Sequence, residues 1–217
     1  MNNGLCISAH CRIKDNSAAL NGETVFTLEE ASFTQFIKAL YRDQKFEYSK
    51  FFKMDNLSKL GFAAAEILLS NADDKIMGEE VGVVLANANA SLDTDVKHQE
   101  SIADAKNYFP SPSVFVYTLP NIVIGEICIK HKFTGENACL ISKSFDSDQL
   151  FEYTMNLFNN GKVSSCLIGW VDCYLGEYDA ALFFITRNND KKSNFESERL
   201  KSIYQIIIKI FLFARVK

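Results

Sequence analysis

The sequence predicts a layered α/β domain in which helices cover both faces of a sheet. Two continuous apolar runs, beginning at Val81 and Ala180, are typical of strands that are buried on both sides. Other segments place apolar side chains every three or four residues, as along the buried face of a helix. At 217 residues and 47% hydrophobic content, the chain can form one sizeable domain or two small ones that share a core. We expect a single domain over residues 1–217.

The first elements along the chain are a strand and a helix. Residues 5–13 alternate loosely between apolar and polar types and suit a strand. A polar loop is expected to follow through Gly22, because Asn, Ser and Gly favour turns. Thr27 or Ser32 can then cap a helix whose apolar positions recur at three and four residues.

A second helix is expected over residues 54–71, followed by the buried strand from Val81. Asp55 can cap this helix, leucine and isoleucine line one side of it, and consecutive alanines permit close packing. The charged segment 91–107 after the strand forms either an exposed helix or a loop.

All three prolines of the chain fall between positions 110 and 120. Because proline fixes φ and lacks an amide donor, we expect a stiff loop there, outside any central strand. A helix over residues 121–132 follows, with Gly125 where a neighbouring segment approaches closely. This helix is expected to stop near Gly135.

The second half of the chain repeats the alternation of strands and helices. A short apolar strand over 138–142 leads into a polar bend at 144–147, and a helix then runs to a stop at Gly161. The runs CLIGWVDCYL and AALFFIT predict two more strands. The last helix starts at Asn194, with two glutamates in its first turn, where the helix dipole favours negative charge.

The cysteines and histidines form no recognisable metal-binding pattern. The trio Cys6, His10 and Cys11 falls on an alternating strand, where three side chains cannot all face one side. The six cysteines lack C-x-x-C spacing and lie mostly in apolar runs, so we expect reduced, buried thiols. His10, His98 and His131 are expected to be solvated or structural. We predict no metal and no cofactor.

Charge and hydropathy exclude some classes of partner. The net charge of −4 comes from 27 acidic and 23 basic residues mixed along the chain, so a basic field for nucleic acid is missing. The N-terminus lacks the pattern of a secretory signal, and we expect a cytoplasmic protein. The longest apolar tract near the end of the chain, residues 206–214, is interrupted by Lys209 and is too short to span a membrane.

Several motifs together resemble the N-terminal half of a β-ketoacyl synthase of the thiolase-like superfamily. The segment FFKMDNLSKLGFAAAEILL is similar to an early helix of that family. Ser111 and Pro112 are followed by Asn121 and then by Gly125, in the family's arrangement. The resemblance implies a thiolase-like half-fold, and it is strongest from position 54 to position 185.

The same resemblance aligns Ser144 with the nucleophilic cysteine of the family. Gly135 stands nine residues before position 144 and Gly161 seventeen after it, as the family places its glycines. Here the position holds serine, and Lys143 precedes it where the family favours a small residue. The family's second half, which brings two histidines and a lysine, is not found in these 217 residues, so we expect the catalytic half to be absent.

The resemblance therefore implies a non-catalytic ketosynthase-like subunit. It is similar to the short chain-length factors that pair with an active β-ketoacyl-ACP synthase in fatty acid or type II polyketide pathways, such as those for aryl polyene and flexirubin pigments. The strand over 138–142 would pair across a twofold interface. Phe109, Phe115, Tyr117 and Lys143 are the candidate residues for the acyl tunnel or the interface. A full-length ketosynthase and an acyl carrier protein are the expected partners.

Two alternatives stay open. An acyl-thioester hydrolase or acyltransferase could use Ser144, with Lys143 or Asp146 assisting, although an unactivated serine hydroxyl is a poor nucleophile. A homodimeric module that binds acyl chains or carrier protein needs only the same fold and a self-complementary edge. Ser144 could also serve merely as the N-cap of the following helix.

Overall fold

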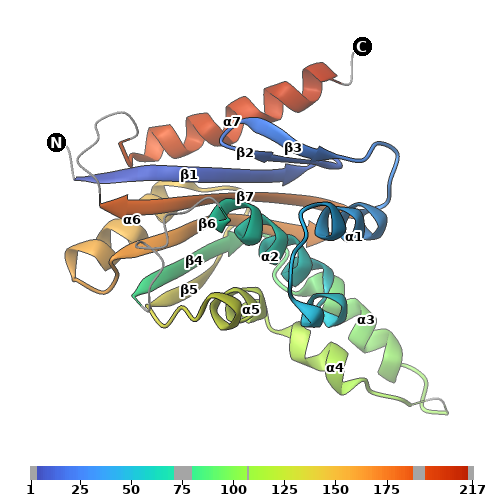
Figure 1. Ribbon diagram of the computed structural model, residues 1–217. Helices are drawn as coiled ribbons and strands as arrows, with labels where there is room; N and C mark the ends of the chain where they lie inside the picture. The colour runs from blue at the N-terminus through green and yellow to red at the C-terminus, as the bar shows by residue number, and fades with distance from the viewer. Residues whose placement is uncertain (1–3, 71–79, 107, 188–193, 215–217) are drawn as a thin grey trace.

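The computed structural model describes residues 4–70, 80–106, 108–187 and 194–214. Its centre is a seven-stranded mixed sheet in the order β3-β2-β1-β7-β6-β4-β5 (Figure 1). The strands are β1 (Leu5–Lys14), β2 (Ser17–Leu20), β3 (Glu23–Thr27), β4 (Val81–Asn87), β5 (Asn137–Ile141), β6 (Ser165–Tyr174) and β7 (Glu177–Arg187). The helices are α1 (Phe33–Asp43), η1 (Ser49–Lys53), α2 (Asn56–Leu69), α3 (Leu92–Ile102), α4 (Pro112–Phe115), η2 (Val116–Thr118), α5 (Ile122–His131), α6 (Ser147–Asn159) and α7 (Ser197–Ala214).

The strand directions place several turns at one end of the sheet. Strand β4 runs parallel to both β5 and β6, whereas β1, β2, β3 and β7 make antiparallel pairs, as β6 does with β7. The C-terminal ends of β4, β5 and β6 therefore lie at the same end as the β1–β2 and β6–β7 turns. The two edges of the sheet are β3 and β5.

Hydrophobic layers on both faces of the sheet confirm the predicted α/β architecture. One layer joins α1, α2 and α5 to the sheet, with Phe36, Leu60 and Ile127 buried completely. The opposite layer joins α6 and α7, through residues such as Leu150 and Leu200. Strand β4 lies between the layers and is buried along its whole length, as its continuous apolar run predicts.

The predicted helix caps are confirmed for the first two long helices. Ser32, rather than Thr27, caps α1 in a capping box with Gln35. Asp55 caps α2 by accepting a hydrogen bond of 2.9 Å from the backbone N–H of Ser58. Each cap satisfies backbone donors that have no partner inside the helix.

The loop predicted through Gly22 is wrong, because a hairpin of two short strands, β2 and β3, occupies that region and continues to Thr27. Its polar residues form two separate tight turns. Asp15 and Asn16 adopt positive φ angles of 48° and 59° in the first turn, and Asn21 and Gly22 do so in the second. The sequence marks both turns, but the four residues between them are too few to show an alternating pattern.

The proline segment and its neighbours also differ from expectation. Pro112 begins a short helix, α4, which Ser111 caps, so the segment is not only a loop. A side chain added at Gly125 would meet no neighbouring atom within 4 Å, and the predicted close approach is therefore wrong. Helix α5 ends at His131, with Lys132 in the left-handed conformation, rather than near Gly135.

Helix α7 begins at Ser197, three residues later than predicted, and Glu198 lies in its first turn. The preceding residues add to the sheet, since Phe195 donates a backbone hydrogen bond of 3.0 Å to Leu5. Among the described residues, no single helix is long and apolar enough to cross a membrane. Segments Pro112–Thr118 and Ile122–His131 reach that length only together, and they are bent by 100° relative to each other.

Candidate functional site: the elbow after strand β5

The elbow is the exposed bend that joins β5 to α6. The backbone N–H of Ser142 donates to the carbonyl of Asn87 at 2.9 Å and ends the pairing of β5 with β4. Lys143 and Ser144 then lie exposed in the bend. Asp146 caps α6 by accepting a hydrogen bond of 3.0 Å from the backbone N–H of Gln149. The N-cap interpretation of Ser144 is therefore wrong, because Asp146 takes that role.

Ser144 has no activating base in the described part of the chain. Its hydroxyl makes no hydrogen bond with any described residue, and the three histidines have other neighbours. The ring of His10 lies 6.4 Å from that of Phe183, and burial lowers the His10 pKa. The ring of His98 lies 5.3 Å from that of Phe115. A serine without an adjacent base is a weak nucleophile at neutral pH.

The cysteines do not supply a substitute nucleophile at the elbow. Burial raises the pKa of the Cys128 thiol to about 11 and also raises that of Cys139, whose Sγ lies 3.7 Å from the carbonyl oxygen of Pro120. All six thiols are free; four are buried, and these two are half-buried. Within the described ranges, three His, Cys, Asp or Glu side chains nowhere gather as metal ligands.

A pair of stacked aromatic rings supports the elbow. The ring of Phe145, next to Ser144, lies parallel to the ring of Tyr204 in α7, with centroids 4.1 Å apart. The Arg12 guanidinium lies 4.2 Å from the centroid of the Tyr204 ring. Such stacked and cation–π contacts fix a side chain in one orientation. Helix α7 therefore anchors the bend that carries Ser144.

Asp179 forms hydrogen bonds with the polar groups of this stack. It accepts hydrogen bonds from Arg12 at 2.7 Å, Tyr204 at 2.9 Å and Lys14 at 3.4 Å. Arg12 is completely buried, and a buried guanidinium requires such a counter-charge. A second link joins the beginnings of α6 and α7, where Ser197 donates to Ser147 at 3.1 Å.

The four predicted tunnel or interface residues lie in three different environments. Phe109 and Phe115 are 78% and 61% exposed; Phe115 belongs to α4, which projects with α3 from the body of the domain (Figure 1). Lys143 is exposed at the elbow. Tyr117 is buried, and its hydroxyl donates to Glu126 at 2.9 Å. Phe109 and Phe115 therefore present free apolar surface, whereas Tyr117 anchors the segment to α5.

Sequence reasoning missed the role of Asp172 at the elbow's end of the sheet. Its carboxylate accepts hydrogen bonds from the backbone N–H groups of Ala88 and Asn89 and from the Asn89 side chain, at 2.7–3.1 Å. These bonds shape the chain where it leaves β4. A single carboxylate inside the otherwise apolar run CLIGWVDCYL was the available indication, because an acid that is partly removed from water needs donors.

Two glycines, Gly135 of the family pattern and Gly169 in β6, have a steric explanation. A side chain at Gly135 would lie 2.5 Å from the backbone oxygen of Val81. Gly169 has a φ of 155°, and a side chain there would lie 2.1 Å from the backbone oxygen of Ala181. Both sites exclude any larger residue because the neighbouring backbone passes too close.

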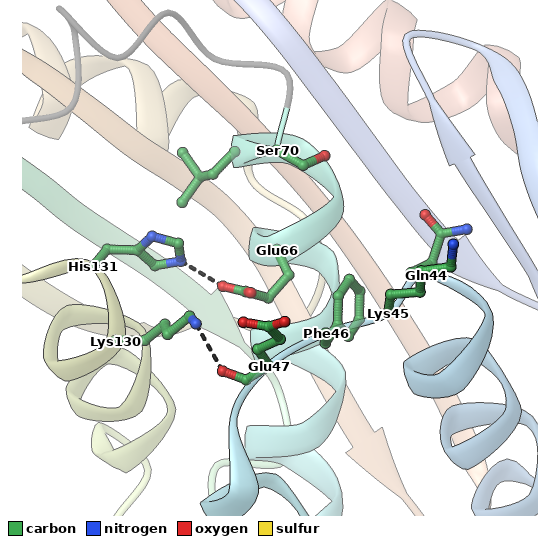
Figure 2. A pocket seen from close by; sticks show the side chains of 9 residues that line it. Gln44, Lys45, Phe46, Glu47, Glu66, Ser70, Lys130 and His131 are labelled. Carbon is green, nitrogen blue, oxygen red and sulfur yellow. Dashed lines mark hydrogen bonds and ion pairs between the residues drawn. The ribbon is translucent and has the colours of Figure 1, made fainter.

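A pocket of about 330 Å³ lies at the opposite end of the sheet from the elbow (Figure 2). It is formed where α2 and α5 end, beside the segment after α1. His131 Nε2 lies 2.6 Å from Glu66 Oε1, and the Lys130 ammonium donates to the Glu47 carbonyl at 2.8 Å. These contacts join α2, α5 and the segment after α1, and none of the predicted site residues lines the pocket.

Comparisons with known proteins give the fold but no sequence-based family. No protein-family model matches the sequence, and no curated protein sequence matches it. Among solved structures, the chain is similar to the ishigamide ketosynthase/chain length factor, with a TM-score of 0.62 and 15% identity over 87% of this chain and 63% of that one. It is also similar to the ketosynthase ApeO in complex with its chain length factor ApeC from Xenorhabdus doucetiae, with a TM-score of 0.60 and 11% identity over 95% of this chain and 92% of that one.

A third similar structure is the AntDE:AntF complex, described as a type II polyketide synthase acyl carrier protein with its ketosynthase bound to the hexaketide. Its TM-score is 0.57 at 14% identity, over 84% of this chain and 62% of that one. The chain thus spans somewhat less than two thirds of the ishigamide and AntDE:AntF structures and nearly all of the ApeO–ApeC one. The comparisons confirm that the chain has the thiolase-like α/β fold of ketosynthases and chain length factors.

Proposed function

We propose that this chain is a chain-length-factor-like subunit that pairs with an active β-ketoacyl-ACP synthase in type II polyketide assembly. The observation that carries the proposal is the open edge of β5, which ends at a bend without an activated nucleophile among the described residues. The similar solved structures, which contain ketosynthases, chain length factors and a carrier protein, support it at the level of fold.

The edge of β5 offers a defined set of backbone groups for pairing. Val83 donates to the carbonyl of Glu136, and Ser142 donates to that of Asn87, so the even-numbered residues of β5 turn their backbone toward β4. The N–H and C=O groups of Cys139 and Ile141 therefore point away from the sheet. Such groups form hydrogen bonds readily with a strand from another chain.

Exposed apolar side chains lie on β5 itself and on segments that precede it in the chain. Ile141 is 55% exposed and Ile129, on the preceding helix α5, is 65% exposed. Phe109 and Phe115 add large exposed surface on the projecting α3–α4 region. Exposed apolar surface of this kind is typical of protein interfaces. We infer that Phe109 and Phe115 reach the partner and contribute to the wall of its acyl tunnel, with Lys143 at the interface and Tyr117 behind them.

The resemblance of the sequence to β-ketoacyl synthases supports the finer parts of the proposal. We propose a cytoplasmic subunit in which residues 1–217 form a single domain. Its pathway would be that of an aryl polyene or related pigment, or of a fatty acid, with an acyl carrier protein delivering the chain. In this role the elbow holds β5 in place and takes no part in condensation.

Co-expression with the ketosynthase encoded nearest to this chain's gene tests the proposal. We expect a stable complex on size-exclusion chromatography, with condensation of malonyl thioesters by the complex and none by this chain alone. A stable monomer that does not bind the ketosynthase would contradict the proposal. A homodimer unaffected by the ketosynthase would favour the alternative of a self-paired acyl or carrier-protein module.

The exposure of Ser144 at the elbow is the one observation that favours an enzyme instead. A hydrolase or acyltransferase would form an acyl ester on Ser144, with Lys143 or Asp146 assisting. Intact-protein mass spectrometry after incubation with an acyl carrier thioester distinguishes the two functions. We expect no adduct, and an acyl group on Ser144 that disappears in Ser144→Ala would establish the enzyme.

A further inference from the structure

We propose that a groove beside the β1–β2 turn binds an organic cation that carries a guanidinium or primary ammonium group. The groove has a volume of about 850 Å³ and lies along the β3 side of the sheet. Its lining extends from β3 to β7, and strands β6 and β4 lie between β7 and β5. The proposal is therefore independent of the pairing proposed for β5.

Negative charge dominates the described walls of the groove. Glu29, Glu30 and Glu177 line it, and all three are exposed without an ion pair to any described residue. Lys14, the cation at the end of β1, lies 3.4 Å from Asp179 and is thereby engaged elsewhere. Clustered carboxylates without counter-charges attract cations, and their planar oxygens suit guanidinium groups.

Ser17 supplies an independent indication that a ligand is missing. It lines the groove and is only 4% exposed, yet its Oγ has no hydrogen-bond partner among the described residues. Ser17 pairs with Thr27, and Ala19, two residues further, pairs with Thr24, so these hydroxyl side chains share one face. An unpaired buried hydroxyl is costly, and an N–H of a bound cation would satisfy it by donating to Oγ.

The groove is held in shape before any ligand arrives. The Tyr178 hydroxyl donates to Asn16 Oδ1 at 2.6 Å and accepts from the Asn16 backbone N–H at 2.8 Å. The Asn16 side chain in turn donates to the carbonyl of Ala31 at 2.7 Å. These bonds fix the β1–β2 turn against β7 and the segment before α1, which reduces the entropy lost on binding.

Aromatic side chains complete the site. Tyr178 and Phe33 line the groove, with ring centroids 4.7 Å apart. Burial raises the pKa of Tyr178 to about 12, so its hydroxyl stays neutral. An aromatic ring beside carboxylates is the usual setting for a guanidinium or ammonium group. The groove thus combines charge, an orphan acceptor and aromatic surface for one class of ligand.

Titration with agmatine, which carries both a guanidinium and an ammonium group, tests the proposal. Calorimetry and NMR at low salt should show saturable binding with one site. Changing Glu30→Gln together with Glu177→Gln should weaken binding about tenfold or more, and Ser17→Ala about three- to tenfold. Glu152→Gln removes the same charge from the surface of α6 and serves as the matched control, with affinity unchanged.

A short peptide with one arginine, in a parallel titration, distinguishes the source of the cation. Saturable binding of agmatine points to a free amine, and binding of the peptide alone points to a side chain of a protein; either supports the site. Failure of both probes to bind overturns it, as does binding that the groove substitutions leave unchanged. If Ser17→Ala did not fold, the two glutamine substitutions at exposed positions would still decide the question.

Discussion

The two edges of the sheet differ in how open they are to another strand. The β3 edge belongs to a tight hairpin, carries Glu23, Thr24 and Thr27, and follows a strand with a register shift between Ala18 and Ala19. The β5 edge runs parallel to its neighbour and carries an apolar side chain, Ile141, that is 55% exposed. Charges and bulges protect an edge against pairing. The chain therefore protects the β3 edge and leaves the β5 edge available for pairing.

The largest effect is expected from a proline at the open edge. Ile141→Pro removes an N–H that points away from the sheet, so no bond to β4 is lost. We expect association with the ketosynthase to weaken by about 100-fold or more, because the inserted ring also obstructs an incoming strand. Binding is measured by surface plasmon resonance.

Ile141→Thr is the matched control for this change. It keeps the N–H and a β-branched side chain, so its affinity should stay much closer to that of the unaltered chain. Equal affinities for the proline and threonine variants would show that β5 does not pair. A large loss of thermal stability in the proline variant would instead show that β5 is not an open edge.

A smaller effect is expected from the exposed aromatic residues of the α3–α4 region. Phe109→Ser should weaken association about tenfold, and Phe115→Ser should do the same, as for apolar residues at an interface. Product analysis by mass spectrometry is expected to show altered chain lengths. Tyr108→Ser is the control, because it removes another exposed ring next to Phe109. If it weakens association with the ketosynthase as much as Phe109→Ser does, Phe109 makes no specific contact.

A still smaller effect is expected from the support of the elbow. Tyr204→Phe removes the hydroxyl that donates to Asp179 but keeps the stack with Phe145. The free energy of unfolding should fall by about 1 kcal/mol, measured by urea denaturation. Because the stack persists, association should change little, and a strong loss of association would show that the hydroxyl itself sets the elbow.

The smallest effect is expected at Ser144. Ser144→Ala removes an exposed hydroxyl without a partner among the described residues, so stability should stay within about 0.5 kcal/mol. Association and product formation by the complex should also be unchanged. A loss of product with association intact would require a catalytic role for Ser144.

The sequence predicts the regular parts of this fold well because their determinants are local. Ser32 and Asp55 cap the helices they precede, and the apolar run from Val81 forms a strand buried on both faces. The strand before the elbow lies at an edge, as the resemblance implies. Each of these depends on residues close together in the chain, or on one strongly apolar run.

The predictions that the structure contradicts concern contacts between distant segments or very short elements. The β2–β3 hairpin was not predicted, because its polar turn residues suggest a loop. Asp146 and not Ser144 caps α6, because the bend continues two residues further. Gly125 looked like a packing site but lies where no segment approaches. The support of the elbow joins Arg12, Asp179 and Tyr204 from three elements, and no local pattern places these residues together.

Hydrogen–deuterium exchange of the β5 amides shows whether the ketosynthase pairs with this strand. In the isolated chain, the amides of Cys139 and Ile141 should exchange fast, while those of Ala138 and Leu140, which face β4, should be protected. Addition of the ketosynthase should protect Cys139 and Ile141 and leave the other two unchanged. If the amides of Cys139 and Ile141 still exchange fast in a complex that is demonstrably formed, β5 is not the edge that pairs with the ketosynthase.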